Sequence, residues 1–470
     1  MIYAMTYQSV NPFNQQILKT YSELSDSELD NALNTAAQAF ELWRQKSFSE
    51  RALITEKVAA LLRSQVDKYA RLATLEMGKL IQEAREEVLL SSDIIAYYAR
   101  NAKGFLSATR LRPRSGRAEV VSTPLGILLG IEPWNFPFYQ LARFAAPNIM
   151  AGNVVMVKHA ASVPQCGIAF EELWQEAGAP AGVYTNLLIS YEQVKRLIQD
   201  PRVQGVALTG SVEAGKAIAS LAGQNLKKST MELGGSDPFI VLDDADLDQA
   251  VKYAVSGRMF NAGQCCTASK RFIVMEGLAD SFLQKFKSEL EKFKPGDPMD
   301  GSTTLSPLSS EAALKKLLDQ VDRAIAHGAE LVLGGKRIPR SGAFMEPTIL
   351  TRIQPDNPAF HEEFFGPVAL FFRVKDEQEA IRLANQSQFG LGGSVFTKDI
   401  KKGKRVAGQI ETGMVFINQT TDSTPELPFG GIKNSGYGRE LSDLGIHEFV
   451  NKKLVSVAEQ AKPVEKKAAA

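Results

Sequence analysis

The sequence predicts an α/β protein with two parallel sheets, and three observations lead to this prediction. From Leu125 onward, short apolar runs alternate with segments of helical periodicity, a pattern typical of parallel sheets covered by helices. This alternation occurs as two successive series, which indicates two sheets. The chain is 470 residues long, which is too long for one compact core and favours two or three domains.

The first hundred residues are predicted to be mostly helical. Ser25 and Glu28 have the spacing of a capping box, and apolar residues follow at helical intervals. Further helices are expected over 50–64 and 81–99. Residues 109–124 then alternate polar and apolar positions around a Pro/Gly turn, which predicts a projecting β-hairpin.

The two α/β series account for most of the remaining chain. The first predicts strands at 125–131, 153–157, 183–189 and 205–209, with helices near 138–149, 164–177, 191–199 and 212–222. The second predicts strands at 238–242, 271–275, 368–374 and 413–418, with a helix near 311–327. The last ten residues are small, polar and charged, so we expect them to be frayed.

Composition excludes several classes of protein. Hydrophobic residues make up 44% and charged residues 23%, values that argue against disorder. The formal net charge of +1 offers no overall attraction for nucleic acid or membranes, and no apolar stretch approaches the length of a membrane span. Three cysteines, Cys166, Cys265 and Cys266, are too few for a disulfide framework, so we expect a reducing, cytoplasmic compartment.

The segment TGSVEAGKA at 209–217 lies where a strand is expected to pass into a helix. Gly210, Gly215 and Lys216 nearly match a P-loop, but Ala217 lacks the hydroxyl that holds Mg²⁺. A nucleoside triphosphatase is therefore disfavoured. A plain tight turn and a pyrophosphate site at a helix N-terminus both remain open on spacing alone.

Three further residues have patterns that favour chemistry. Cys266 follows an Asn/Gly/Gln turn whose backbone N–H groups can stabilise a thiolate, although a cysteine is more often a buried apolar residue. Glu232 precedes Gly234 at the end of an apolar strand and is a candidate base, either buried or solvated. Asn135, between two prolines, is a candidate hydrogen-bond donor or part of a structural turn. Cys166 is expected in the core.

Six motifs, in this order along the chain, resemble the aldehyde dehydrogenase superfamily over almost the whole sequence. They are PWNFP at 133–137, TGSVEAG at 209–215, ELGGSDP at 232–238, FNAGQCC at 260–266, EEFFGPV at 362–368 and PFGGIKNSGYGRE at 428–440. KHA at 158–160 and the segment 436–449 are most similar to the succinate-semialdehyde dehydrogenases of that family.

The resemblance implies a role for each matching residue. It makes Cys266 the nucleophile, Glu232 the general base and Asn135 the oxyanion donor. It implies NAD(P)⁺ as cofactor and no metal. The implied cofactor contacts are Trp134, Lys158, Ala161, Gly210, Ser211, Gly215, Leu233, Glu363 and Phe365.

Cofactor preference and substrate are the finer expectations. Ala161 stands where many NAD-preferring members have a glutamate, so NADP⁺ should be used at least as well as NAD⁺. The resemblance implies that Arg143 binds the carboxylate of succinate semialdehyde; a surface or intersubunit salt bridge is the alternative. Arg258 is a second candidate cation, and Thr424 is expected to line the same substrate site. The alternatives are glutarate semialdehyde or a broad range of aliphatic aldehydes, a cofactor-free thiol esterase, and a catalytically idle protein of this fold.

The resemblance also implies domains and an assembly. Residues 1–108 and 125–234 would form a Rossmann-type cofactor domain, and 235–440 an α/β catalytic domain. Residues 109–124 and 441–470 would form a small β oligomerisation arm and the C-terminal tail. We expect a homodimer or homotetramer that acts on a small aldehyde, with no nucleic-acid or membrane partner.

Overall fold

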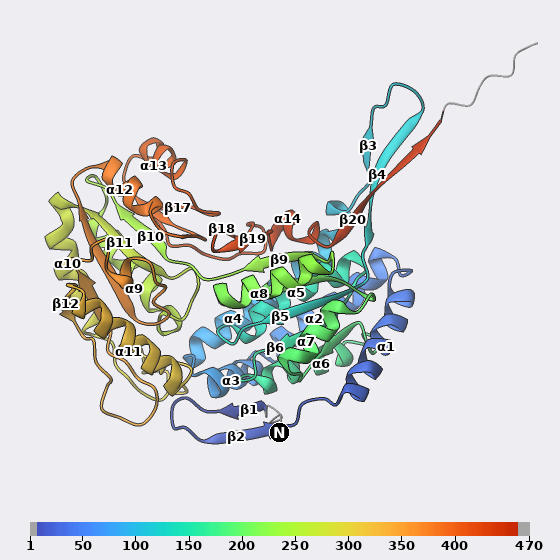
Figure 1. The fold of residues 1–470 in the computed structure, drawn as a ribbon, viewed down its shortest axis with the longest axis horizontal. Coiled ribbons are helices and arrows are strands. Elements are labelled where there is room, and N and C mark those ends of the chain that lie inside the picture. Colours follow the sequence, from blue (N-terminus) through green and yellow to red (C-terminus); the bar gives the residue numbers. More distant parts are fainter. Residues whose placement is uncertain (1–6, 459–470) are drawn as a thin grey trace, which may run out of the picture.

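The computed structural model describes residues 7–458. Two large sheets lie beside each other, and a narrow β arm projects from one end (Figure 1). The predicted tail and the start of the predicted cofactor domain, residues 459–470 and 1–6, lie outside the described residues. Within 7–458, no helix has the length and apolar character needed to cross a membrane.

The first sheet has six strands in the order β19-β9-β8-β5-β6-β7, and all neighbours are parallel except β19 and β9. These strands are β5 (Ile127–Glu132), β6 (Val154–His159), β7 (Tyr184–Asn186), β8 (Val203–Thr209), β9 (Lys228–Glu232) and β19 (Gly436–Tyr437). The helices of this half are α1 (Asp26–Trp43), α2 (Phe48–Ser64), α3 (Val66–Met77), α4 (Ile81–Phe105), α5 (Pro137–Ala151), α6 (Pro164–Glu176), α7 (Tyr191–Gln199), α8 (Val212–Gln224) and α14 (Ser442–Ile446).

The second sheet has seven strands in the order β12-β13-β14-β11-β10-β16-β17, parallel except at β12. Its strands are β10 (Asp237–Val241), β11 (Ser269–Met275), β12 (Glu330–Leu333), β13 (Thr348–Thr351), β14 (Val368–Val374), β16 (Ser394–Phe396) and β17 (Phe416–Ile417). Its helices are α9 (Leu247–Met259), η1 (Phe260–Gly263), α10 (Glu276–Leu290), α11 (Glu311–Ala326), η2 (Pro358–Phe360), α12 (Glu377–Asn385) and α13 (Ile400–Ala407).

Three small sheets complete the fold. They are β1 (Tyr7–Val10) with β2 (Ile17–Tyr21), β15 (Phe389–Gly390) with β18 (Ile432–Lys433), and the arm of β3 (Thr109–Leu111), β4 (Arg117–Pro124) and β20 (Val450–Val457). The antiparallel β3–β4 pair confirms the hairpin predicted over 109–124. Cys166 is fully buried in the core, as expected.

The boundary expected at residue 440 does not coincide with sheet membership. Gly436 and Tyr437 form β19, which pairs with β9 of the first sheet, and α14 packs against α4 and α5. The physical reason is that β9 would otherwise be an exposed edge strand, and a returning segment covers it.

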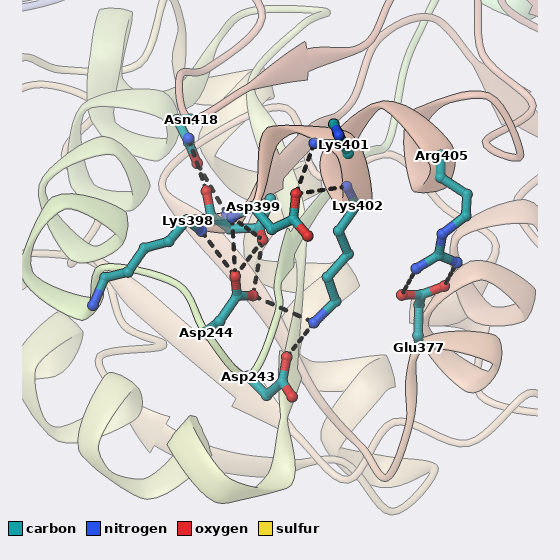
Figure 2. A network of polar contacts seen from close by, with 10 residues as sticks. Asp243, Asp244, Glu377, Lys398, Asp399, Lys401, Lys402, Arg405 and Asn418 are labelled. Atoms are coloured by element: carbon teal, nitrogen blue, oxygen red, sulfur yellow. Dashed lines mark hydrogen bonds and ion pairs between the residues drawn. The ribbon is translucent and has the colours of Figure 1, made fainter.

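A polar network joins the loop that follows β10 to the loop that follows β16 in the second sheet (Figure 2). The Asp244 carboxylate accepts from the Thr397 hydroxyl at 2.7 and 2.8 Å and from the Asp399 N–H at 3.1 Å. Lys402 bridges Asp243 and Asp244. Burial alone would raise the pKa of Asp244, but these donors hold it below its usual value. The network therefore fixes the start of α13 against the end of β10.

Candidate active site

The site lies where the strand order of the first sheet reverses. β5 is followed in space by β6 and β7 on one side and by β8 and β9 on the other. Ligands of doubly wound sheets bind outside the carboxyl ends of the strands at such a point. Here a cavity of about 580 Å³, the strand-end cavity, is lined by the loop after β5 and by the turn after β8.

A second cavity of about 660 Å³, the aromatic cavity, adjoins the first. Its aromatic lining residues are Phe136, Tyr139, Phe260, Phe293 and Phe429. Cys266 and Gln140 line both cavities, whereas Cys265 lines only the aromatic one. Of the two adjacent thiols, the second is therefore the one that can reach ligands on both sides.

A strained turn presents the Cys266 loop. Asn261 and Ala262 have φ angles of 54° and 51°, and Gly263 follows at 76°. The buried Gln264 side chain holds this turn, because its amide donates to the Asn261 carbonyl and its oxygen accepts from the Ser309 N–H at 2.8 Å. Backbone strain of this kind persists only where the surroundings fix it, and it is frequent at active sites.

The structure brings Asn135 to the same loop. Its Nδ2 donates to the Gln264 carbonyl at 3.2 Å, and its own carbonyl accepts from Asn261 Nδ2 at 2.9 Å. Because an amide nitrogen carries two hydrogens, the second remains for another acceptor. Asn135 also lines the strand-end cavity beside Cys266. In this position the Asn135 amide can donate to the oxygen of a bound carbonyl compound whose carbon is attached to the Cys266 sulfur.

The two thiols titrate as a pair. The thiol of Cys265 is hydrogen-bonded to that of Cys266 and to the Thr267 hydroxyl, which lies 3.1 Å away. The Cys266 contact, the Thr267 hydroxyl and the Lys270 charge lower the first pKa of the pair to about 6, against an opposing effect of burial. The hydrogen bond with Cys265, then burial and the Cys265 charge, raise the pKa of the Cys266 thiol well above its usual value. In this arrangement the first negative charge of the pair therefore forms on Cys265, beside the Cys266 thiol.

Glu232, the last residue of β9, is buried at 3% exposure and lines the strand-end cavity. Its main-chain carbonyl accepts from the Gly210 N–H at 3.0 Å, which fixes the strand end. Neither carboxylate oxygen has a hydrogen-bond partner among residues 7–458. Burial, and then the charge of Glu440, raise the pKa of Glu232 well above its usual value. A carboxyl group with a raised pKa can exchange protons near neutral pH.

Six of the nine expected cofactor contacts line the strand-end cavity. They are Trp134, Gly210, Ser211, Leu233, Glu363 and Phe365. The rings of Trp134 and Phe365 meet edge to face with centroids 5.7 Å apart. Glu363 Oε1 accepts from the Gly235 N–H at 3.0 Å.

The turn into α8 presents backbone N–H groups to this cavity. Ser211 caps the helix, because its Oγ accepts from the Ala214 N–H at 3.2 Å. Residues 210–213 line the cavity, so the positive end of the helix faces it. Gly215 does not line it. A Cβ at Gly215 would lie 2.5 Å from the Leu233 side chain, so this glycine allows α8 to approach β9.

Lys158 and Ala161 lie beyond the strand-end cavity lining, at the carboxyl end of β6 and in the turn that follows. The Lys158 ammonium is buried, donates to the His159 carbonyl and lies 5.4 Å from the ring centroids of both Tyr7 and Tyr191. Burial lowers its pKa to about 8. These residues therefore extend the site along the same sheet edge.

Arg143, the residue that the resemblance assigns to a substrate carboxylate, does not line the aromatic cavity. It is buried and forms an ion pair with Glu440, while its other nitrogens donate to Tyr139 Oη and Thr209 Oγ1, each at 3.1 Å. Tyr139 and Arg143 are four residues apart on α5, so they share one face. The tyrosine, one turn closer to the cavity, covers the arginine and donates to Ser423 Oγ.

The other two expected substrate contacts also lie outside the lining. Arg258 is fully buried and donates to the Gly263 carbonyl at 2.6 Å, so it supports the strained turn. Thr424 does not line the aromatic cavity, but the preceding residues 420–423 do. Spacing along the chain placed Thr424 in a segment that reaches the aromatic cavity, but side-chain direction depends on neighbours that are distant in sequence.

Several lining residues went unrecognised in the sequence. Besides the aromatic wall, the aromatic cavity contains the acidic residues Glu83, Glu86, Glu87 and Asp422. The α4 residues carry no motif, since they are spaced as in any amphipathic helix. Lys270, four residues after Cys266, contacts the Cys266 loop, and its position just after the FNAGQCC motif was the available signal. Residues 7–458 contain no cluster of three His, Cys, Asp or Glu side chains arranged to hold a metal ion.

The chain is similar to several known proteins over almost its whole length. The chain is 49% identical over 449 residues to succinate-semialdehyde dehydrogenase [NADP(+)] of Deinococcus radiodurans, covering 96% of this chain and 94% of that protein. It is 44% identical to a probable succinate-semialdehyde dehydrogenase [NADP(+)] of Synechocystis sp., covering 97% of this chain and all of that one. The crystal structure of succinic semialdehyde dehydrogenase from Streptococcus pyogenes in complex with NADP⁺ superposes with a TM-score of 0.95 at 48% identity, covering 96% of this chain and all of that one.

The model of the aldehyde dehydrogenase family matches residues 3–455, which include both large sheets, the two cavities and the Cys266 loop. With this match over nearly the whole chain, and with relatives of up to 49% identity among those above, the chain belongs to the aldehyde dehydrogenase family.

Proposed function

We propose that this protein oxidises succinate semialdehyde to succinate with NAD(P)⁺, through covalent intermediates on Cys266. The observation that carries the proposal is that Cys266 lines both cavities, so one thiol can meet an aldehyde on one side and a cofactor on the other. The names of the relatives from Deinococcus radiodurans and Synechocystis support the choice of substrate and of NADP⁺.

The strand-end cavity fits a dinucleotide. The N-terminus of α8, with Gly210 and Ser211, would hold the pyrophosphate, because its N–H groups and dipole face the cavity. Trp134, Glu363 and Phe365 would hold the nicotinamide ribose end. When bound, the nicotinamide supplies the hydride acceptor that the reaction requires.

The chain's own residues would perform the other steps. The Cys266 thiolate adds to the aldehyde carbon, and the carbonyl oxygen takes up the negative charge. The Asn135 amide and the Cys266 N–H stabilise this oxyanion. After the carbon has lost its hydride, Cys266 holds the acyl group as a thioester. Glu232 takes a proton from the water that attacks the thioester, and the thiolate leaves as the carboxylic acid forms.

The cofactor preference is expected to be set beside Lys158. Ala161 itself places no carboxylate there, so a 2′-phosphate would meet the Lys158 ammonium, on which the Glu23 carboxylate also acts. We therefore expect kcat/KM with NADP⁺ to equal or exceed that with NAD⁺. Ala161→Glu should reverse this order, and initial rates with both cofactors measure it. A wild-type protein that fails with NADP⁺ would contradict this assignment.

The carboxylate end of the substrate would meet hydroxyl groups rather than a guanidinium. Thr420, Ser423 and Tyr139 line the aromatic cavity, and Tyr139 Oη accepts from Arg143. Arg143 would therefore act on the substrate through the tyrosine hydroxyl. Because Glu83 and its acidic neighbours line the same cavity, their protonation should influence binding of an anion.

One spectrophotometric assay separates the competing functions. Formation of NAD(P)H is followed with succinate semialdehyde, glutarate semialdehyde, propanal and hexanal, and p-nitrophenyl acetate hydrolysis is followed without cofactor. We expect the highest kcat/KM with succinate semialdehyde and none with Cys266→Ala. A higher value with another aldehyde would refute the substrate, and ester hydrolysis without any NAD(P)H formation would favour a thiol esterase.

Assembly and location belong to the same proposal. The arm exposes the apolar residues Leu111, Leu454, Val455 and Val457, which a second copy would cover in a homodimer or homotetramer. Residues 7–108 and 125–234 would bind the cofactor, and 235–440 would supply the nucleophile. Three cysteines and no disulfide framework favour a reducing, cytoplasmic compartment. Light scattering of the wild type, and of a variant with Leu454→Lys, would test the interface.

A further inference from the structure

Lys270, the second residue of β11, is a buried cation that none of the steps above uses. Its side chain is 1% exposed, and its Nζ donates to the main-chain carbonyls of Cys265 at 2.9 Å and Cys266 at 2.7 Å. The same Nζ lies 3.3 Å from Glu363 Oε1. One ammonium therefore contacts the loop that carries the nucleophile and a carboxylate of the strand-end cavity.

The carboxylate is held firmly on its other side. Glu363 Oε1 also accepts from the Gly235 N–H at 3.0 Å, and a Cβ at Gly234 would lie 2.3 Å from Glu363 Oε2. A Cβ at Gly235 would lie 2.5 Å from the Cys266 carbonyl oxygen. The two glycines therefore leave room for the Glu363 carboxylate and the Cys266 loop to lie against the same turn. Lys270 contacts both the carboxylate and the loop.

The geometry uses the donors of Lys270 fully. An ammonium has three hydrogens, and here the carbonyls of Cys265 and Cys266, a more distant Ala268 carbonyl at 3.5 Å and one Glu363 carboxylate oxygen lie within reach. Other charged groups around this position are Asp237, which is buried, and Arg258, whose guanidinium supports the strained turn. The positive charge of Lys270 is therefore balanced locally and directed at the loop rather than at solvent.

We propose that Lys270 is a positioning residue that couples Glu363 to the Cys266 loop. Through this coupling, the position and charge of the Glu363 carboxylate affect the reactivity of the Cys266 thiol. The coupling to cofactor rests on the proposed binding of NADP⁺ at Glu363. Lys270 lines neither cavity, so it would touch neither substrate nor cofactor. It acts by fixing the Cys265 and Cys266 carbonyls and the Glu363 carboxylate relative to one another.

The test is alkylation of Cys266 by iodoacetamide, with the modified peptide quantified by mass spectrometry. Rates are measured from pH 5.5 to 9.5, with and without NADP⁺, for the wild type, Lys270→Met, Lys270→Arg, Glu363→Gln and the double variant with Met and Gln. We expect Lys270→Met to slow alkylation at pH 7 about tenfold and to move the pH midpoint upward, as loss of a nearby opposite charge does. Lys270→Arg should stay within about threefold of the wild type because it keeps the charge.

The double variant distinguishes coupling from two independent effects. If Lys270 acts together with Glu363, the double variant loses less than the product of the two single losses. The proposal would be overturned if the losses of alkylation rate in the two single variants multiply in the double variant. It would also be overturned if Lys270→Met is alkylated at the wild-type rate. Should Lys270→Met not fold, Lys270→Gln takes its place in the same comparison.

Arg271→Met is the matched control. Arg271 is the adjacent buried cation of β11, but it donates to the carbonyls of Ser236, Leu383 and Ala384, away from the cysteines. We expect its alkylation profile to match the wild type, and a shift equal to that of Lys270→Met would reduce Lys270 to a structural role. Alkylation without NADP⁺ requires neither aldehyde nor cofactor, so a failure of the proposed function leaves this result unaffected.

Discussion

Replacing Arg143 with methionine should destabilise the fold, because the arginine is the buried partner of Glu440. Removing one member of a buried ion pair leaves an uncompensated charge and typically costs about 3–5 kcal/mol. The hydrogen bonds to Tyr139 and Thr209 are lost as well. We therefore expect the free energy of unfolding at pH 8 to fall by about 4 kcal/mol.

The loss should depend on pH in a defined direction. Burial raises the pKa of Glu440, while the Arg143 charge lowers it; Glu132 and Glu232 respond to the same charge. Without the guanidinium, these folded-state pKa values rise further above their unfolded values. A carboxyl group whose pKa is higher in the folded protein than in the unfolded protein destabilises the folded state at pH values above its unfolded-state pKa. This destabilisation grows with pH until the folded-state pKa is reached. The loss in Arg143→Met should therefore be smaller at pH 5.5 than at pH 8.

Urea unfolding followed by tryptophan fluorescence at pH 5.5 and 8 measures both effects. Adding Glu440→Gln to Arg143→Met should recover part of the loss, because the buried charge is then removed. Arg337→Met is the control, since Arg337 pairs with Glu311 while both side chains are more than 40% exposed, and its loss should stay below about 1 kcal/mol. Equal losses for the two arginines, or no recovery in the double variant, would refute this reasoning.

Three further predictions concern the proposed activity. Burial raises the pKa of Glu83 to about 7, so its carboxylate becomes charged above that pH and the KM for succinate semialdehyde should rise. Glu83→Gln should remove this rise, propanal should show none, and an unchanged profile in the variant would contradict the assignment. Because the pKa of Lys158 is about 8, the KM for NADP⁺ should increase above pH 8 while that for NAD⁺ changes little. A parallel increase for both cofactors would argue against contact with the 2′-phosphate. Asn135→Ala should lower kcat about 10²- to 10³-fold, as loss of an oxyanion donor does, with little change in cofactor Kd. A fall in cofactor affinity alone would assign Asn135 to cofactor binding.

Local patterns predicted the parts of the fold that depend on neighbours in the chain. The capping box at Ser25 and Glu28 is formed, and the strand-to-helix turn at Gly210 and Ser211 presents the start of α8 to the strand-end cavity. The strand carrying Glu232 ends where expected because the Gly234–Gly235 turn follows it. The helices α9 and α10 and the strand β13 were not predicted, because their apolar residues face a core formed by distant segments.

The sequence by itself determined the α/β class, the order of most strands and helices, and the motifs that resemble one enzyme family. Only the tertiary structure decided which side chains meet. Arg143 and Glu440 are far apart in the chain but pair in the interior, and Cys266 rather than Cys265 lines both cavities. The physical reason is that backbone preferences are local, whereas the direction and charge state of a buried side chain depend on the groups that remove it from water.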